Sequence, residues 1–597
     1  MRGKCRALAA IAIAFLALLG LAPPSYAQSE PLAPQTISLP TAPGSIDGLG
    51  ESFEPQLNTG SYIFRIPLKL PPVRGKVQPE VSMTYNSGGG NGPLGLGWTL
   101  RVPSIQRQTD KGLPRYDDND AATDTFVTGD GEELVKRADG TYRPEVEREF
   151  TKWENLGANG WKATRNDGTV LRFGQTAQAR QDRAPGETFR WMLESAEDTN
   201  GNRVEYSYVK DAGQIYLSEV RCGLHATETS EFFRLSFAYD DLRPDKLTDY
   251  RGRFRCETRL RLRSVTLKLG ERRVRHWAFD YDETKALTQL GKFTAFGDER
   301  TDLGPDALLN EDFLPPIEFD YSGEALGADA GIEEVGPFLN ISMSSGEARL
   351  TDLDRDGLPD VLLYENGKYH SMKNLGPGNG FGPLTEFTTT AFYPDLNDPA
   401  IRLADLRGDG TLKLLVDEGD GLYFREFTSA TTLGPDVDFT LPGNFPLSDP
   451  AVQTVDIDND RAMDFMAVDF DRFSFIISGG GDTPNTFYET PPSPVAANVS
   501  FASGWQLADM NGDRVPDLVA LATTNGGGVV FYPGMGWGEF DAAVTISGGP
   551  ADQDLGSRDL AGLTLVDLDG DGLSDLVQVE SGLVLRTKLM SYWFPEL

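Results

Sequence analysis

The chain has 597 residues, with 90 acidic side chains against 55 lysines and arginines, and its formal net charge at pH 7 is −35. Nucleic acid and anionic membrane surfaces repel such a polyanion, so the charge excludes both as partners. Hydrophobic residues make up 39% of the chain and aromatic residues 10%. This is enough apolar surface for folded cores, and the length predicts two or three domains.

Residues 1–27 are predicted to be a secretory signal peptide. Three basic residues precede an uninterrupted apolar run at residues 7–22, and Ser25 and Ala27 are small residues of the kind that a cleavage site requires. The apolar run is short for a membrane anchor, and no later stretch is predicted to insert into a membrane. We therefore expect cleavage after Ala27, a mature net charge of −38 once the three basic residues are removed, and a secreted protein.

Residues 28–47 hold four prolines and are predicted to form an extended lead-in segment. From residue 48 to residue 322, apolar residues recur at every second position, which is typical of strands with one buried face. The clearest alternating sets are Tyr62/Phe64/Ile66, Val81/Met83/Tyr85, Val204/Tyr206/Tyr208, Leu235/Phe237/Tyr239, Val265/Leu267/Leu269 and Trp277/Phe279/Tyr281. We therefore predict a β-rich, largely antiparallel domain at 48–322, followed by an acidic linker at 323–334.

Cys222 and Cys256 are the cysteines that remain after cleavage. Export to an oxidising compartment permits a disulfide between them. Two free buried thiols are the alternative.

The last part of the chain, residues 335–597, contains a repeated aspartate loop. Five nine-residue windows align without gaps, at 352–360, 405–413, 456–464, 509–517 and 567–575. Their starts are separated by 53, 51, 53 and 58 residues. A period near 50 residues suits a four-stranded propeller blade, so an all-β chain that ends in a β-propeller is predicted.

Four of the loops are predicted to bind calcium. Carboxylates at loop positions 1, 3, 5 and 9 can converge on one hard cation, as in the first nine positions of an EF-hand loop. Apolar strand patterns, rather than helices, flank the loops. The predicted ligands are Asp352, Asp354, Asp356, Asp360, Asp456, Asp458, Asp460, Asp464, Asp509, Asn511, Asp513, Asp517, Asp567, Asp569, Asp571 and Asp575.

The alternative is a set of acidic turns held by side-chain-to-backbone hydrogen bonds without a metal. That alternative does not explain seventeen aspartates in five short windows, where mutual repulsion would destabilise an empty loop. The calcium is expected to be structural because no ligand position is left open for a substrate. The second loop departs from the pattern: Arg407 and Lys413 replace ligands, so ion pairs with Asp405 and Asp409 are expected there instead of calcium.

Residues 48–98 resemble the start of the SpvB-type domain, which the virulence-plasmid B protein shares with the B component of insecticidal toxin complexes. The resemblance rests on the run GLGESF at 48–53, on PEVSMTYNS at 79–87 and on GGGNGPLGLGW at 88–98. It continues through RQTDKGLPRY at 107–116. The aspartate loops, with GFGP at 380–383, are similar to the FG-GAP/VCBS-type repeats that accompany this domain.

This resemblance implies a large secreted β-scaffold with a protein partner. In toxin complexes the B component helps to enclose a C-terminal toxic polypeptide, and its propeller docks on the pore-forming A component, so a pore-forming A-type or a C-type toxin component is the partner that the resemblance implies. Residues 198–208 look like the repeat of the RHS-type shells found in such proteins. The chain ends about 22 residues after the fifth loop, so a fragment and a stand-alone scaffold are both open, and enclosure of a cargo is not carried over.

Enzymatic activity is not expected from the sequence. Glu147-Arg-Glu149 offers the Glu-x-Glu signature of an ADP-ribosyltransferase, but the accompanying Ser-Thr-Ser pattern is missing, as is a Gly-x-Ser-x-Gly elbow. The glycine-rich run at 88–97 leads into a strand pattern, so it is predicted to be a turn and not a nucleotide loop. A calcium-dependent adhesion or carbohydrate-binding propeller remains the competing function.

Overall fold

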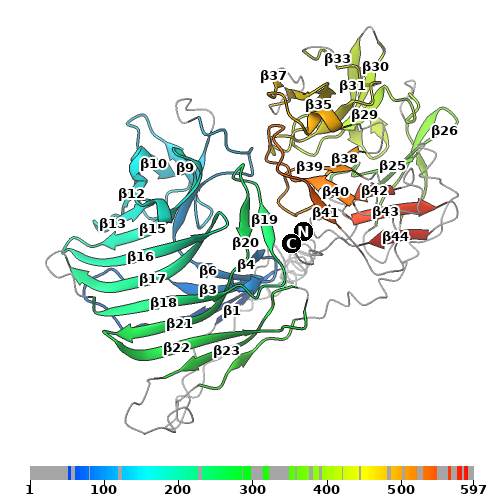
Figure 1. Ribbon diagram of the computed structural model, residues 1–597. Helices are drawn as coiled ribbons and strands as arrows, with labels where there is room; N and C mark the ends of the chain where they lie inside the picture. The colour runs from blue at the N-terminus through cyan, green and yellow to red at the C-terminus, as the bar shows by residue number, and fades with distance from the viewer. Residues whose placement is uncertain are drawn as a thin grey trace, which may run out of the picture. The chain divides into compact units, whose positions relative to one another are not determined.

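The structure is a computed structural model that is described over strands 52–55, 563–566, 575–580 and 584–588 and over residues 61–79, 81–117, 124–225, 231–285, 287–297, 314–321, 348–356, 360–375, 381–388, 393–419, 421–442, 445–479, 486–499, 505–520 and 529–546. In these residues the regular elements are strands and three short 3-10 turns, η1 (Gly157–Asn159), η2 (Ala177–Ala179) and η5 (Ala496–Asn498) (Figure 1). All pairings between these strands are antiparallel, as predicted. The described part of the chain has no helix of the length and hydropathy that crossing a membrane requires. The predictions for residues 1–27 and 28–47 lie outside the described residues.

A small sheet forms the core of the first of two compact units. Its strand order is β1 (Ser52–Pro55), β2 (Tyr62–Pro67), β3 (Ser82–Asn86) and β6 (Trp98–Arg101). Ile66, Met83 and Trp98 are buried at the alternating positions that the sequence predicts. The rings of Tyr85 and Trp98 pack with centroids 5.3 Å apart, as cross-strand aromatic pairs do.

The second unit begins with a sheet of sixteen strands, part of which closes into a barrel. Strands β7 to β13 pair in sequence, and β15 pairs with both β13 and β7, so this ring of strands has no free edge. The barrel strands are β7 (Ser104–Arg107), β8 (Phe126–Thr128), β9 (Glu133–Lys136), β10 (Tyr142–Pro144), β11 (Lys152–Asn155), β12 (Trp161–Thr164), β13 (Val170–Phe173) and β15 (Glu187–Glu197), with β14 (Arg180–Ala184) paired to β15.

Aromatic side chains fill the barrel core. Trp161 is fully buried, and its ring lies 4.9 Å from Phe126, 5.0 Å from Tyr142 and 6.0 Å from Trp191 between centroids. Edge contacts of this kind add to the area that the rings bury. These residues come from four different strands, so the packing joins distant parts of the sequence.

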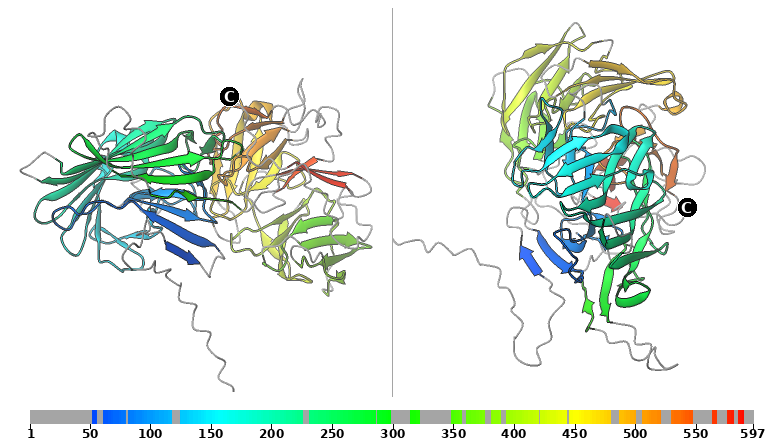
Figure 2. Two further views of the ribbon diagram at one scale, coloured as in Figure 1. Left: turned by 90° about the horizontal axis from the view of Figure 1, so that it is seen from below. Right: turned by 90° about the vertical axis from the view of Figure 1, so that its left-hand side faces the viewer.

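Beyond the barrel the sheet continues as long antiparallel strands, which twist and curve together in Figure 2. They are β16 (Asn202–Asp211), β17 (Gln214–His225), β18 (Phe233–Asp240), β21 (Arg261–Leu269), β22 (Arg272–Tyr281), β23 (Leu290–Phe296) and β24 (Ile317–Glu318). All the alternating sets predicted in this part of the sequence lie on these strands. In β16, for example, Val204, Tyr206 and Tyr208 are buried on one face.

Two short hairpins complete this part. β19 (Leu247–Asp249) pairs with β20 (Cys256–Thr258), and β4 (Asn91–Gly92) pairs with β5 (Gly95–Leu96). The glycine-rich run is therefore a hairpin that leads into a strand, as predicted. Cys222 and Cys256 are free and buried, so the disulfide is wrong and the alternative of two free thiols is confirmed. Burial raises the pKa of both thiols.

The last part of the chain folds into five successive meander sheets, the topology of propeller blades (Figure 1). We number these blades one to five. The first blade holds β25 (Ala348–Thr351), β26 (Asp360–Glu365), β27 (Lys368–Met372) and β28 (Thr385–Glu386), and the second holds β29 (Ile401–Ala404), β30 (Lys413–Asp417), β31 (Leu422–Ser429), β32 (Thr432–Leu433) and β33 (Val437–Phe439). The third blade holds β34 (Val452–Val455), β35 (Asp464–Asp469), β36 (Arg472–Ile477) and β37 (Thr486–Glu489), the fourth holds β38 (Trp505–Ala508), β39 (Asp517–Ala520), β40 (Val529–Tyr532) and β41 (Val544–Ile546), and the fifth holds β42 (Leu563–Val566), β43 (Asp575–Glu580) and β44 (Val584–Lys588).

Each aspartate window falls between the first and second strands of its blade. The loops therefore join strands, as predicted, and the sequence period is the blade period. The domain limits 48–322, 323–334 and 335–597 stay predictions, because residues 322–347 lie outside the described residues.

Candidate metal centre

The aspartate at loop position 9 starts the second strand of the blade and holds the loop in place. Asp360, Asp464 and Asp517 are all fully buried. Asp464 accepts hydrogen bonds from the backbone N–H of Ile457 in its own loop (3.1 Å) and of Ser478 after the third strand (2.7 Å). Asp360 does the same with Leu353 and Asn374, and Asp517 with Met510 and Gly534. In the first, third and fourth blades this aspartate therefore links the loop, the second strand and the segment after the third strand through hydrogen bonds that require no cation.

The aspartate at position 1 curls the loop around its own carboxylate. In the third loop Asp456 accepts the N–H groups of Asp460 (3.0 Å) and Arg461 (2.8 Å). The curl requires a left-handed residue at position 4, where Asn459 has φ 61°. Arg355, Gly408 and Gly512 occupy the same position with φ of 67°, 69° and 79°. Asparagine and glycine adopt this conformation most readily, which explains their presence at three of the four described loops.

The third loop brings three predicted ligands together. One oxygen each from Asp456, Asp458 and Asp464 lies within 4.8 Å of the others. Asp458 is 3% exposed, and its Oδ1 is buried without a hydrogen-bond partner. A buried oxygen of this kind costs free energy unless something satisfies it. The fourth predicted ligand, Asp460, is half-buried and caps the N–H of Ala462.

The electrostatics of this trio are unfavourable without a cation. Burial, reinforced by repulsion between the carboxylates, raises the pKa of Asp456 to about 6, of Asp458 to about 7 and of Asp464 to about 8. Burial also raises the pKa of Asp460. A bound divalent cation would remove this penalty by stabilising the charged forms.

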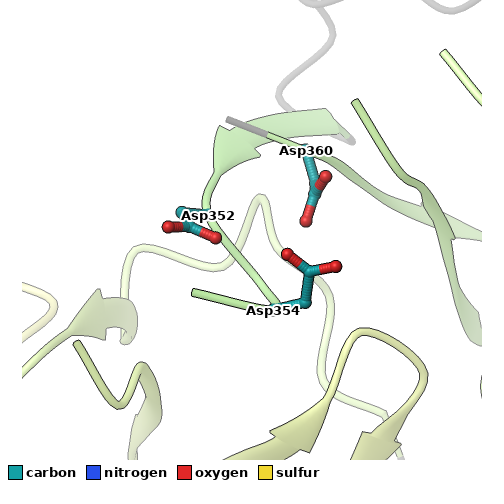
Figure 3. Close-up of side chains that lie close together, drawn as sticks. All are labelled: Asp352, Asp354 and Asp360. Carbon is teal, nitrogen blue, oxygen red and sulfur yellow. The ribbon is translucent and has the colours of Figure 1, made fainter. Parts of the chain in front are cut away.

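The first loop also forms a trio, made of Asp352, Asp354 and Asp360, whose carboxylates turn toward one another in Figure 3. Here the chain supplies a positive charge of its own. The Lys373 ammonium pairs with Asp354 and lies 2.9 Å from Asp356 Oδ2. These two carboxylates raise the pKa of Lys373. A cation in the first loop would therefore compete with this lysine.

In the fourth loop position 3 is an asparagine, and its three described aspartates do not form a trio of carboxylates. Asp509 accepts the N–H groups of Gly512 (2.8 Å) and Arg514 (2.7 Å), and Asp513 accepts that of Val515 (2.9 Å). Asn511 accepts the N–H of Asp513 (3.0 Å). Burial raises the pKa of Asp513 to about 8 and that of Asp517 well above its ordinary value. The loop therefore has the same charge problem as the third loop.

The second loop partly follows its prediction. Arg407 Nη1 lies 4.0 Å from Asp409 Oδ2, which is the expected ion pair. Asp405 instead accepts the backbone N–H groups of Arg407, Gly408 and Gly410. Lys413 at position 9 is buried, with its ammonium 5.3 Å from the centre of the Phe424 ring. A cation of the protein thus occupies the place that Asp464 holds in the third loop.

In the fifth loop, Asp567, Asp569 and Asp571 lie outside the described residues, as does the side chain of Asp575. The chemistry of the described loops is that of a hard cation site: every predicted ligand is a carboxylate or amide oxygen. Calcium accepts irregular oxygen ligand sets more readily than magnesium does. The first and third loops each hold a buried carboxylate oxygen without a hydrogen-bond partner, Asp354 Oδ1 and Asp458 Oδ1, and the third loop fits such an ion better because no lysine of the described residues pairs with two of its carboxylates.

Together, the fold and the loops define a class: an all-β protein in which a long antiparallel sheet is followed by blades with aspartate loops. Comparison with known families shows which members of this class the chain is similar to. The family described as Salmonella virulence plasmid 65kDa B protein matches residues 56–156 and 140–234, and the FG-GAP-like repeat matches residues 352–416. The chain therefore carries an SpvB-type domain followed by FG-GAP-like repeats, as its motifs predicted.

Curated relatives and solved structures agree with this assignment. The mono(ADP-ribosyl)transferases SpvB of Salmonella choleraesuis and Salmonella typhimurium are 29% identical over 30% of this chain, and the chain covers 34% of their length. A Tc holotoxin pore from Photorhabdus luminescens superposes with a TM-score of 0.71 at 21% identity, over 92% of this chain and 29% of that chain. A TcdB2–TccC3 complex gives a TM-score of 0.54 at 20% identity, over 92% and 31%. The chain thus has the fold of a Tc toxin segment.

One prediction is corrected by these relatives. The sequence predicted no enzymatic activity, and this prediction is contradicted, because the curated relatives are named mono(ADP-ribosyl)transferases. Their common segment with this chain is about a third of their length, and the activity is that of the whole relatives. Glu147 and Glu149 lie in the connection between β10 and β11. Proteins with an SpvB-type domain include ones with this activity, so the lack of enzyme motifs in this chain did not justify predicting no enzyme.

Two residues around the loops escaped the sequence analysis. Lys373 follows β27 and reaches the first loop from across the sheet, and Leu113 contacts the third loop from before β8. Lys373 has no sequence signal of its own, and Leu113 lies in the run RQTDKGLPRY, which indicates the family but not the contact, because both contacts depend on tertiary structure.

Proposed function

We propose that this chain is a secreted scaffold of the toxin-complex type, with structural calcium ions in its blades and a protein partner. The fold likeness to a Tc holotoxin carries the proposal, because it extends over both the long sheet and the blades. At 21% identity this likeness concerns the fold. The partner, export and the metal are our inferences.

The calcium part of the proposal is supported by the third loop. Asp456, Asp458 and Asp464 would hold the ion, and one oxygen of Asp458 lacks any other partner. A bound ion supplies positive charge that fixes the loop between two strands. The chain's own contribution is the curl at Asn459 and the position-9 aspartate, which orient the ligands in advance.

Calcium uptake can be tested on the full chain by calorimetric titration with CaCl2 after treatment with EDTA. We expect uptake in wild type and the loss of one site in Asp458→Asn. The control is Asp409→Asn, a change in the second loop, where Arg407 and Lys413 replace ligands; it should leave the stoichiometry unchanged. No uptake by wild type, or equal uptake by Asp458→Asn, would refute the calcium site.

The partner can be tested by co-purification with a pore-forming toxin component of the kind found in Tc complexes. Stable co-elution supports the scaffold function. Binding to glycans or cell surfaces by the full chain, without such co-elution, would favour the adhesion propeller instead.

A further inference from the structure

The segment of residues 109–115, here called the docking segment, connects β7 to β8 and contacts the third and fourth blades. Leu113 is 3% exposed and belongs to a core cluster whose other buried members come from these blades. They include Ile457 in the third loop, Val515 in the fourth loop, and Trp537. The side chain of Leu113 also approaches Gly536 so closely that a β-carbon there would lie 2.1 Å from its Cδ1.

The docking segment touches the third loop at the residue with the unsatisfied oxygen. Leu113 N–H donates to the backbone carbonyl of Asp458 (2.5 Å). Arg115 Nη2 lies 3.7 Å from Asp458 Oδ2, and its guanidinium stacks 4.4 Å from the Trp537 ring centre. On the other side of the loop, Asn459 Nδ2 donates to the carbonyl of Thr109 (3.3 Å). Both the backbone and the carboxylate of Asp458 are therefore positioned by a segment outside the blade.

A second segment, in the β19–β20 hairpin, supports the fourth loop. Tyr250 N–H donates to Asp513 Oδ2 (2.7 Å), and its hydroxyl donates to Asp541 Oδ2 (2.8 Å). The two segments also contact each other, because Arg253 Nη1 donates to the carbonyl of Pro114 (3.3 Å). At the fourth loop an amide of the hairpin satisfies a ligand oxygen. At the third loop Asp458 Oδ1 stays free to bind an ion.

We propose that cation binding in the third loop and docking of residues 109–115 stabilise each other, so that this loop is a cation-dependent interaction surface for the chain's own β7–β8 connection. This inference rests on the proposed function, since it requires the loop to take up a cation. The physical reason is linkage: the docking segment fixes the backbone of Asp458 and Asn459, and a bound ion would fix the same two residues. Binding of the ion then lowers the entropic cost of docking, and docking lowers the entropic cost of binding the ion. Arg115 opposes the ion electrostatically, as Lys373 does in the first loop, so the inference requires the shared ordering to outweigh that repulsion.

Hydrogen exchange of the Leu113 amide tests this directly, because that N–H donates to the Asp458 carbonyl. The full chain is compared in CaCl2 and in EDTA, with the β12–β13 hairpin as an internal reference. We expect calcium to slow exchange in the peptide that contains Leu113 by about tenfold or more, and to leave the reference unchanged.

The matched variants change loop position 4, which is left-handed in both loops. Asn459→Gly keeps that backbone but removes the contact with Thr109, and Arg355→Gly makes the same change in the first loop. We expect Asn459→Gly to weaken calcium binding at the third loop by about threefold or more and to reduce the protection of Leu113. Arg355→Gly should leave both unchanged.

If the chain takes up calcium but the Leu113 amide exchanges at the same rate in CaCl2 and in EDTA, the inference is overturned and the proposed function still stands. Unchanged affinity in Asn459→Gly would also overturn it. Absence of any calcium uptake would overturn both.

Discussion

Replacing Asp464 by asparagine and by alanine should separate the two roles of the position-9 aspartate. Its carboxylate accepts two backbone N–H groups and is fully buried, and its pKa is raised to about 8. Without a cation at pH 7 the group is therefore largely protonated, and asparagine matches its shape and its lack of charge but offers one acceptor oxygen, whereas the two N–H groups donate to two different oxygens of Asp464. Asp464→Asn in EDTA strands one of these N–H groups and should lower the free energy of unfolding by roughly 1–2 kcal/mol.

Asp464→Ala removes both acceptors and strands two buried N–H groups. Each stranded group costs about 1–3 kcal/mol, so a loss of roughly 2–4 kcal/mol is expected in EDTA after some relief of repulsion with Asp458. In about 1 mM calcium, a site with a Kd of about 10⁻⁴–10⁻³ M adds roughly 0.4–1.4 kcal/mol to wild type, and both variants lose it.

The assay is urea unfolding of the full chain, followed by tryptophan fluorescence, in EDTA and in calcium. In EDTA the asparagine variant should lose about half as much stability as the alanine variant, and in calcium both variants should fall further below wild type. Equal losses for asparagine and alanine in EDTA, or a loss for asparagine that calcium does not change, would refute this account of the loop.

Three further predictions follow from single features. The raised pKa values of Asp456, Asp458 and Asp464 mean that the folded state keeps protons that the unfolded state releases. In EDTA these groups should therefore lower the free energy of unfolding as pH rises from about 4 to about 8, by roughly 3–5 kcal/mol at Asp464 alone. The stability difference between wild type and Asp464→Asn should change with pH, and a difference that is the same at every pH would contradict this. Arg107 is buried, lies 2.5 Å from Asp124 and donates a hydrogen bond to the Thr188 carbonyl, so Arg107→Ala should lower the free energy of unfolding by about 3–5 kcal/mol by leaving a buried charge unpaired. Lys111→Ala, in the exposed ion pair with Glu133, should lower it by at most about 1 kcal/mol, and similar urea midpoints for the two variants would contradict this. Phe470 is 94% exposed and has φ 56° in the two-residue turn between β35 and β36, a backbone conformation that glycine adopts more readily. Phe470→Gly should therefore raise the free energy of unfolding by about 1 kcal/mol, and a lower melting temperature would show that the ring has a packing role.

Much of this architecture could be predicted from periodicity. The alternation at Val204, Tyr206 and Tyr208 reports one buried face of β16, and the spacing of the aspartate windows reports the blade. Both signals are spacings along the sequence: two residues between side chains on one face of a strand, and about 50 residues between successive aspartate windows. They identify strands and turns without reference to any other part of the chain.

The missed features depend on contacts between distant segments. Closure of the barrel requires β15 to pair with both β7 and β13, and the alternation within β15 is the same whether or not the ring closes. The aspartates at positions 1 and 9 were predicted to be ligands, with side-chain-to-backbone hydrogen bonds as the alternative, and their oxygens do accept backbone N–H groups; the sequence could not show that position 9 also accepts an N–H from beyond the third strand. Lys373 directly follows β27, whose last residue Met372 pairs with Val361 next to the first loop. Its contact with Asp354 therefore depends on how these strands pair, which the sequence does not show.

The closed ring of β7 to β13 with β15 limits how another polypeptide can attach to this protein. In an open sheet, the outermost strand offers unpaired backbone groups that a foreign strand can extend. In the ring both neighbours of every strand are already taken, so an incoming chain cannot add itself there in register. Recruitment at the barrel must therefore depend on side chains and turns, and its specificity can change by surface substitution without disturbing the backbone ladder beneath.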